Sequence, residues 1–219
     1  MAQKAKSKTT LKDSIVTLYM QYVLEHETEP KSIYKFCKIN NIKEEDFFSH
    51  FGSFETLKEA IWNQFFQNTT ELLQKNKDYA NYDSKEKMLS FFYTLFELLT
   101  LNRSYVLFTL PNNSSHLKEL KQLKGLRKHI KNFASELVEK GNEGKTLKFA
   151  KQSPKIYAEG AWIQFLFLLK FWVEDTSPNF EKTDVAIEKS VTIIFDVFDN
   201  TPLDSILDFG KFLYKETFA

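Results

Sequence analysis

The sequence predicts an all-α protein, and two observations lead to that fold class. Apolar residues recur at intervals of three and four along most of the chain, which is the spacing of one buried helix face. Glycine and proline are scarce, with 6 and 5 in 219 residues, whereas a chain of many short strands needs frequent turns. At this length we expect one or two compact units.

The first four predicted helices include two short ones. Ser32 is a suitable N-cap for the second helix, and Ser53 opens the fourth. Asn40 and Asn41 form a turn after the second helix, because both tolerate left-handed backbone. The four predicted helices cover about residues 10–29, 31–39, 43–48 and 53–72.

The helices predicted for the rest of the chain are mostly longer. Asp83 or Ser84 caps the first of them, Pro154 opens a very apolar one, and Asn179 is a candidate cap for the next. A break is expected at Pro111. The predicted helices cover about residues 84–99, 117–130, 154–174, 181–199 and 203–214.

Composition excludes several classes of function. The 30 Lys and Arg residues are balanced by 29 Asp and Glu, so any nucleic-acid contact must come from a local patch. The single cysteine, Cys37, excludes an internal disulfide framework, and the four histidines lack metal-ligand spacing. No catalytic or phosphate-binding motif is present, so we expect neither an enzyme nor a bound cofactor or metal. No secretory signal is found, and the apolar stretch at 161–173 is too short to span a bilayer, which predicts a cytoplasmic protein.

The order of the helices predicts two domains. A helix, a short helix, a tight turn and another short helix form the plan of a helix-turn-helix domain, whose last helix enters the DNA major groove. The longer helices that follow suit a bundle that binds a ligand and dimerises. The predicted boundaries are 10–52 for the DNA-binding-like domain and 53–219 for the bundle.

The segment from Ile33 to Leu57 resembles the amino-terminal domain of the TetR family of bacterial repressors. The family pattern reads roughly IA, two residues, AGVS, one residue, GTLY, one residue, HF, one residue, SKE, one residue, L. The matching positions here are Phe36-Cys37, Asn41-Ile42, Phe47-Phe48, His50-Phe51, Ser53, Glu55 and Leu57. The resemblance implies a TetR-like fold and a homodimer that binds double-stranded DNA.

Candidate DNA-contacting residues follow from this resemblance and from local charge. They are Lys4, Lys6, Lys8, Ser32, Lys43, Phe48 and His50. The basic arm at the amino terminus either follows phosphates or is a solubilising tail. His50 either donates to a phosphate or packs at a helix end.

Acidic residues at the start of the predicted recognition helix oppose DNA binding. Glu44, Glu45 and Asp46 stand where the family usually has small polar residues, and phosphates repel carboxylates. One carboxylate could accept a hydrogen bond from cytosine, but three in succession are hard to accommodate. Phe54 also replaces a phosphate-contacting lysine of the family. DNA as a partner is therefore doubtful on these residues.

A second resemblance lies in the carboxy-terminal half. Residues 171–183, FWVEDTSPNFEKT, resemble part of the TetR-fold lipid-binding accessory protein of ubiquinone biosynthesis, which is not a repressor. With 22 Phe, 9 Tyr and 3 Trp in the chain, this implies an apolar or lipid-like small molecule held among aromatic rings. The candidate ligand-binding residues are Phe92, Phe96, Trp162, Phe165, Phe167 and Trp172. The predicted helix at 203–214 is either a lid or a membrane contact, and the lid is favoured.

The apolar helices at 155–173 and 181–199 occupy the place where TetR-like proteins dimerise. The candidate interface residues are Ile187, Val191, Ile194 and Phe198. A charge introduced by Ile194→Glu is expected to weaken association.

These observations predict a one-component transcriptional regulator. In a TetR-like dimer, ligand binding tilts the long fourth helix and changes the spacing of the paired recognition helices. The alternative is a lipid-binding protein that kept the fold and lost DNA recognition, and the acidic residues at 44–46 separate the two hypotheses.

Overall fold

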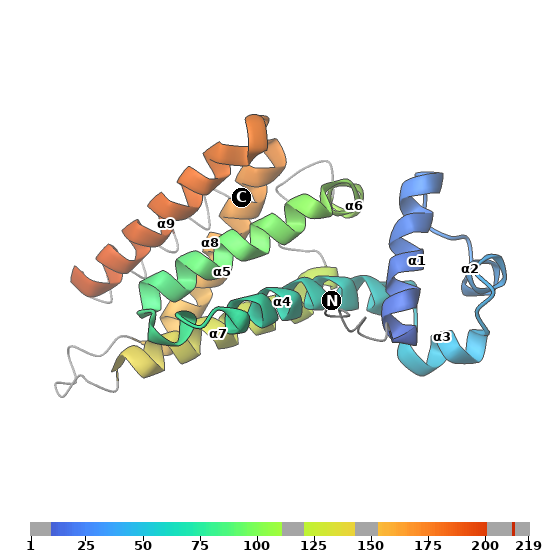
Figure 1. The fold of residues 1–219 in the computed structure, drawn as a ribbon, viewed down its shortest axis with the longest axis horizontal. Coiled ribbons are helices and arrows are strands. Elements are labelled where there is room, and N and C mark those ends of the chain that lie inside the picture. The colour runs from blue at the N-terminus through green and yellow to red at the C-terminus, as the bar shows by residue number, and fades with distance from the viewer. Residues whose placement is uncertain (1–9, 111–120, 143–152, 201–211, 213–219) are drawn as a thin grey trace, which may run out of the picture.

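The described part of the chain is all helical, as predicted. The structure, a computed structural model, describes residues 10–110, 121–142, 153–200 and residue 212, and these contain no strand. Figure 1 shows three helices, α1 to α3, gathered at one end of the long axis, with the longer helices extending away from them. The predicted helix at 203–214 lies outside the described residues, apart from residue 212.

Helices α1 (Leu11–His26), α2 (Ile33–Ile39) and α3 (Glu44–His50) form the amino-terminal unit. Ser32 caps α2 as predicted, because its Oγ accepts the backbone N–H of Lys35 at 3.2 Å. Asn41 adopts the left-handed conformation (φ 54°) that the predicted turn requires. The core of the unit is aromatic, with Phe36 and Phe47 fully buried and their ring centroids 6.1 Å apart in a T-shaped arrangement.

Helix α4 (Phe54–Lys75) joins this unit to the bundle. Ser53 and Thr56 form a capping box at its start, so the predicted opening at Ser53 is confirmed. The ring of Phe54 stacks on Tyr19 of α1 with centroids 5.4 Å apart. The Nζ of Lys58 lies 2.8 Å from the Oε1 of Glu29, a residue that follows the end of α1. The first turns of α4 therefore belong to both units.

The bundle continues through η1 (Tyr79–Asn81), α5 (Ser84–Leu101), α6 (Arg103–Thr109), η3 (Lys121–Leu123) and α7 (Lys124–Asn142). Asp83 caps α5 in a capping box with Glu86. The sequence did not predict α6 as a separate helix. It is separate because Asn102 ends α5, with its side-chain amide donating to the Leu98 carbonyl at 2.9 Å. Within the predicted helix at 117–130, the described part becomes α-helical only at Lys124.

The last described helices are α8 (Pro154–Glu174) and α9 (Glu181–Asn200), joined through η5 (Pro178–Phe180). The proposed cap at Asn179 is wrong, because that residue is left-handed at φ 52°. Asp175 does the capping instead. Its carboxylate accepts from the N–H and hydroxyl of Ser177 (2.8 and 2.6 Å) and of Thr183 (2.9 and 2.7 Å). Burial alone would raise the pKa of Asp175, but these hydrogen bonds hold it at about 2.

Arg103 holds α6 against the end of α8. Its guanidinium donates to the carbonyls of Trp172 (3.0 Å) and Val173 (3.1 Å) in the last turn of α8. The same group lies 4.3 Å from the Trp172 ring and 4.4 Å from the Phe180 ring. One arginine thus connects three elements.

Helix α8 is longer than the apolar stretch noted in the sequence. At 21 residues it is the one described helix long and apolar enough to cross a membrane, and 56% of its most apolar window is buried inside the bundle. Those buried residues pack against the chain's own helices, as expected of a core helix.

Candidate functional site

The surface of α2 and α3 carries the described candidates for DNA contact. Lys43, Phe48 and His50 are all exposed on or next to α3, and the Phe48 side chain is 52% exposed although it is apolar. Ser32 lies half-buried at the start of α2, with its oxygen already accepting the Lys35 N–H. Lys4, Lys6 and Lys8 lie outside the described residues.

The predicted acidic residues share this surface. Glu44 and Glu45 are exposed in the first turn of α3, while Asp46 is half-buried. These carboxylates provide favourable charge at the start of α3, whose N-cap residue, Lys43, has no side-chain acceptor for a capping bond. The surface therefore mixes cations and anions.

Two exposed apolar residues of this surface were missed by the sequence analysis. Tyr34 is 56% exposed and Ile39 is 61% exposed on α2, which buries Phe36 and Cys37. Lys38 places its Nζ 5.8 Å from the Tyr34 ring centroid. Helical spacing alone does not identify Tyr34 as exposed, because it lies three residues before buried Cys37 and therefore near the same face of α2.

Cys37 is a free, buried thiol. Burial first, and then the charges of Glu44 and Asp46, raise the pKa of the Cys37 thiol. Such a thiol is a poor nucleophile at neutral pH. Within the described ranges, no three His, Cys, Asp or Glu side chains come close enough to hold a metal ion.

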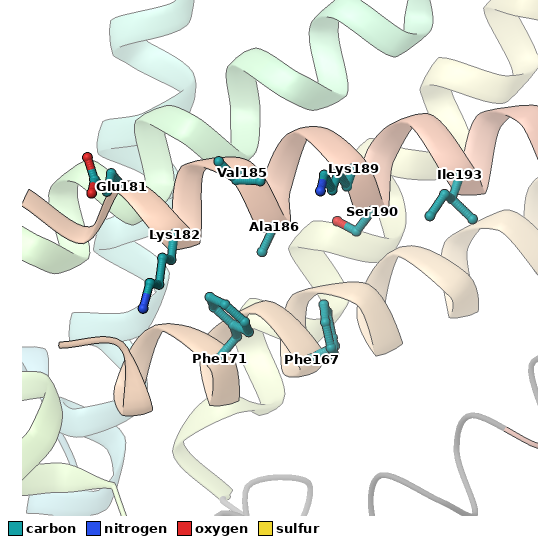
Figure 2. A pocket seen from close by; sticks show the side chains of 9 residues that line it. All are labelled: Phe167, Phe171, Glu181, Lys182, Val185, Ala186, Lys189, Ser190 and Ile193. Atoms are coloured by element: carbon teal, nitrogen blue, oxygen red, sulfur yellow. The ribbon is translucent and has the colours of Figure 1, made fainter. Parts of the chain in front are cut away.

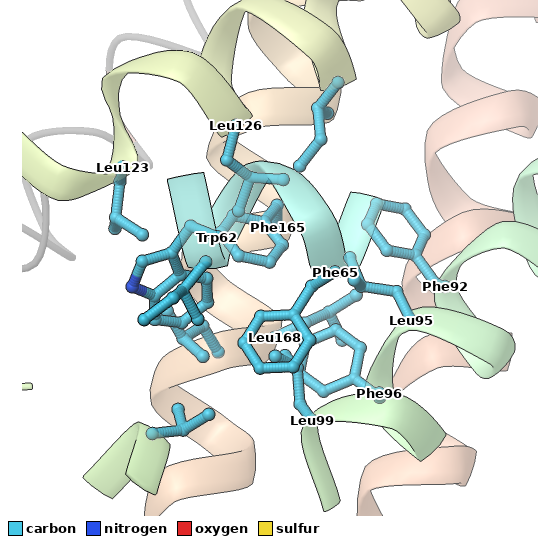
Figure 3. Close-up of a cluster of buried hydrophobic side chains, with 14 of the residues drawn as sticks. Trp62, Phe65, Phe92, Leu95, Phe96, Leu99, Leu123, Leu126, Phe165 and Leu168 are labelled. Atoms are coloured by element: carbon cyan, nitrogen blue, oxygen red, sulfur yellow. The ribbon is translucent and has the colours of Figure 1, made fainter. Parts of the chain in front are cut away.

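Most of the predicted ligand-binding residues are packed in the core. Phe92, Phe96 and Phe165 lie among buried leucines in Figure 3, each at most 3% exposed. Trp162 stacks on Phe165 with centroids 5.3 Å apart, and Trp172 lies 6.2 Å from Phe96. These rings fill space with one another and line neither of the two cavities described below.

The sixth residue, Phe167, lines an open groove between α8 and α9, shown in Figure 2. The groove has a volume of about 610 Å³ and a mostly apolar wall. Its lining residues are Phe167, Phe171, Glu181, Lys182, Val185, Ala186, Lys189, Ser190 and Ile193. Phe167, Val185 and Ile193 are 41%, 47% and 53% exposed, so an apolar stripe runs across both helices.

The predicted interface residues of α9 lie away from this stripe. Ile187 and Val191 are both 0% exposed inside the chain's own core, and Ile194 is half-buried against it. The side chain of Phe198 lies outside the described part. The outward face of α9 is instead the one that carries Val185 and Ile193. A second copy could reach those two side chains, but not Ile187 or Val191.

A second cavity, of about 400 Å³, lies between α4 and α7 and is closed at one end by η1 and α5. Its walls are mixed, with aromatic rings near the middle of both helices and polar or charged groups toward their ends. The lining residues are Phe66, Thr70, Gln74, Tyr79, Lys87, His129, Asn132, Phe133, Glu136, Leu137 and Lys140. No residue of this cavity was nominated from the sequence.

These features define a helical protein with a small three-helix unit, a long linking helix and a bundle with an apolar outer face. The profile described as tetracyclin repressor-like, C-terminal domain, matches residues 87–213, which is more than half of the chain. The chain belongs to this family, the TetR family, as the amino-terminal resemblance predicted. No curated protein and no solved structure matches the chain.

Proposed function

We propose that this chain is a non-catalytic, dimeric transcriptional regulator of the TetR family that binds DNA through α2 and α3. One observation supports this most directly. The α2–turn–α3 unit stands at the end of the long axis and exposes Lys43, Phe48 and His50, beside a carboxy-terminal domain of a repressor family. The lysines of α2 and Lys43, the N-cap residue of α3, are suited to phosphates, and Phe48 to a thymine methyl group.

Dimerisation is proposed to use the apolar groove between α8 and α9. The wall contains Phe167, Val185 and Ile193, all partly exposed in a single chain. Covering such a stripe removes apolar surface from water, which is the main driving force for association. The groove also carries Lys182, Lys189 and Glu181, so a second copy could set opposite charges against one another.

Helix α4 is the proposed link between ligand and DNA. Its first turns hold the α1–α3 unit through the Phe54–Tyr19 stack and the Lys58–Glu29 pair. Its later turns line the cavity against α7 through Phe66, among others. A ligand that shifts the later turns would move the DNA-binding unit with them.

The test of DNA binding is a salt series with fluorescently labelled duplexes. A randomised pool of 30-bp duplexes, enriched over several rounds on the full-length protein, supplies the probe. Affinity for the enriched duplex should fall steeply with salt, because bound lysines displace counterions. Lys43→Gln should weaken binding and reduce the slope, whereas Lys155→Gln, an exposed lysine on α8, should change neither. A flat salt response, or no enrichment at low salt, contradicts DNA binding.

A second candidate function is lipid carriage without DNA recognition, in the same cytoplasmic setting that we propose for the regulator. The observation that favours it is the exposure of Glu44 and Glu45 at the start of α3, since these carboxylates repel phosphates. The predicted aromatic residues leave little room in the core, so an apolar ligand would need to enter through the groove at Phe167. Native mass spectrometry of the purified protein would detect a retained lipid. A lipid-free protein that binds the enriched duplex rejects this alternative.

A further inference from the structure

The cavity between α4 and α7 is formed by two stripes of residues that face each other. On α4 the stripe is Phe66, Thr70 and Gln74, each one helical turn from the next. On α7, residues from His129 to Lys140 follow the same spacing. Two helices that only pack together would place apolar side chains along this line. Here polar side chains interrupt it, and a cavity of about 400 Å³ remains.

One end of the cavity is aromatic. The rings of Phe66 and His129 are nearly parallel, with 19° between planes and centroids 5.0 Å apart. The ring centroid of Phe133 lies 6.5 Å from that of Phe66 and 4.7 Å from that of Phe91, a buried core residue. These rings are fixed by their neighbours and only half-buried, so a flat ring can pack against them without rearranging the core.

The other end of the cavity is cationic. The Ser84 hydroxyl donates to the Leu137 carbonyl at 3.0 Å, which fixes the start of α5 beside the last turns of α7. Lys87 lies three residues after Ser84, and Lys140 lies three residues after Leu137. Both lysines line the cavity. Lys87 donates one hydrogen bond to the Ala80 carbonyl at 3.4 Å, and the other two N–H groups of its ammonium can donate to a ligand.

The charge at this end is not balanced by the described residues. Among the described residues of the wall, Glu136 is the only carboxylate, against Lys87 and Lys140. Among the ion pairs between described residues, none involves either lysine. A ligand that brings one carboxylate would neutralise the excess charge and could accept from both ammonium groups.

We propose that the cavity between α4 and α7 binds an aromatic carboxylate, with its ring against Phe66, His129 and Phe133 and its carboxylate between Lys87 and Lys140. This proposal differs from the apolar or lipid-like ligand that the sequence predicts, because two lysines line the cavity beside the aromatic rings. That such a ligand would act as the effector rests on the proposed regulatory function. The binding itself needs no DNA.

The test is isothermal titration of the full-length protein with 2-naphthoic acid and with its neutral analogue 2-naphthamide. The acid should bind at least about tenfold more tightly than the amide, because only the acid forms charge-assisted hydrogen bonds. The double variant Lys87→Gln/Lys140→Gln should remove that difference and leave the amide unaffected. Lys128→Gln, an exposed lysine of α7 outside the cavity wall, is the matched control and should bind like the wild type.

A filling variant tests the position of the ring. Thr70→Phe places a side chain inside the cavity and should abolish binding of both probes, with a circular dichroism melt to show that the variant folds. The proposal is overturned if the wild type binds neither probe at millimolar concentration, if acid and amide bind equally, or if the double lysine variant still prefers the acid. Because no DNA is present, these outcomes are independent of whether the enriched duplex binds.

Discussion

The α2–α3 surface and the α8–α9 surface differ in what they expose over their aromatic cores. Around the rings of the amino-terminal unit lie lysines and carboxylates, including Lys43, Glu44 and Glu45. The α8–α9 surface of the bundle instead exposes apolar side chains, including Phe167 and Ile193. The first surface suits a charged partner and the second an apolar one, so salt should weaken contacts at the first far more than at the second.

The largest expected effect distinguishes the buried side of α8 from its exposed side, and it compares two phenylalanines of this helix. Phe165 is 0% exposed and Phe167 is 41% exposed, although they are two residues apart. Phe165→Ala should lower the free energy of unfolding by about 3–5 kcal/mol, because it leaves a cavity in the core. In a single chain, Phe167→Ala should lower it by less than about 1 kcal/mol, because the side chain is already partly exposed there. Urea denaturation at a protein concentration low enough to keep the chain monomeric measures both.

The milder variant Phe165→Leu covers the case in which Phe165→Ala does not fold. It should still lose more stability than Phe167→Ala. Equal losses of unfolding free energy at the two positions would contradict the difference in burial between Phe165 and Phe167.

The next test concerns association through the α8–α9 surface. Ile193→Glu places a charge in the apolar stripe and should weaken dimerisation by about a hundredfold or more, because association would have to take that charge out of water. Leu101→Glu is the matched control, since Leu101 is 74% exposed on α5, outside the groove wall. Sedimentation velocity over a concentration series measures the effect.

Ile187→Glu distinguishes the two faces of α9. Because Ile187 is fully buried in the chain's own core, this variant should lose stability as a monomer. Unchanged sedimentation of folded Ile193→Glu would contradict the assignment of the groove to a second copy. Ile194→Glu, which the sequence predicts to weaken association, would mix both effects, because Ile194 is half-buried against the core.

A smaller effect is expected where α8 turns into α9. Asp175→Asn should cost about 1–3 kcal/mol, because the four donors that now meet a carboxylate would face one carbonyl and one amide. The folded pKa of about 2 lies below the ordinary 3.8, so the carboxylate's contribution is complete above the ordinary value and is lost as pH falls toward 2. Stability curves of wild type and variant should therefore converge over that interval.

Asp78→Asn is the control for this pH dependence, since Asp78 is exposed and its side chain makes no capping bond. Its stability should parallel the wild type from neutral pH downward. A constant gap between wild type and Asp175→Asn through the acid range would contradict the proposed role of the hydrogen-bonded carboxylate.

The comparison of surfaces also explains what the sequence could predict. The sequence predicts the N-caps at Ser32, Ser53 and Asp83 because each depends on one polar residue directly before a helix. Periodicity identified which helices have buried faces. It could not tell the core face of α9 from the partner face, because Ile187 and Ile193 are equally apolar.

The candidate ligand site was missed for a related physical reason. An aromatic side chain that fills a core and one that lines a cavity look alike in a sequence, so Phe92 and Phe165 were nominated and Phe66 was not. The cavity depends on two helices, α4 and α7, that are far apart in the chain. Likewise α6 was missed because no glycine or proline separates it from α5, and only Asn102 does so.

The smallest expected effect tests the charged surface, given that the protein binds DNA. Glu44→Gln/Glu45→Gln removes two exposed carboxylates from the start of α3 and should tighten binding to mixed-sequence duplexes roughly fivefold at low salt, because phosphates no longer meet like charge. Glu71→Gln/Glu97→Gln, two exposed acids of α4 and α5, should change affinity little. Fluorescence anisotropy at two salt concentrations measures both, and the gain should shrink at the higher one. If the variant instead loses affinity for the enriched duplex alone, the carboxylates read bases, and the mixed charge of this surface is part of its specificity.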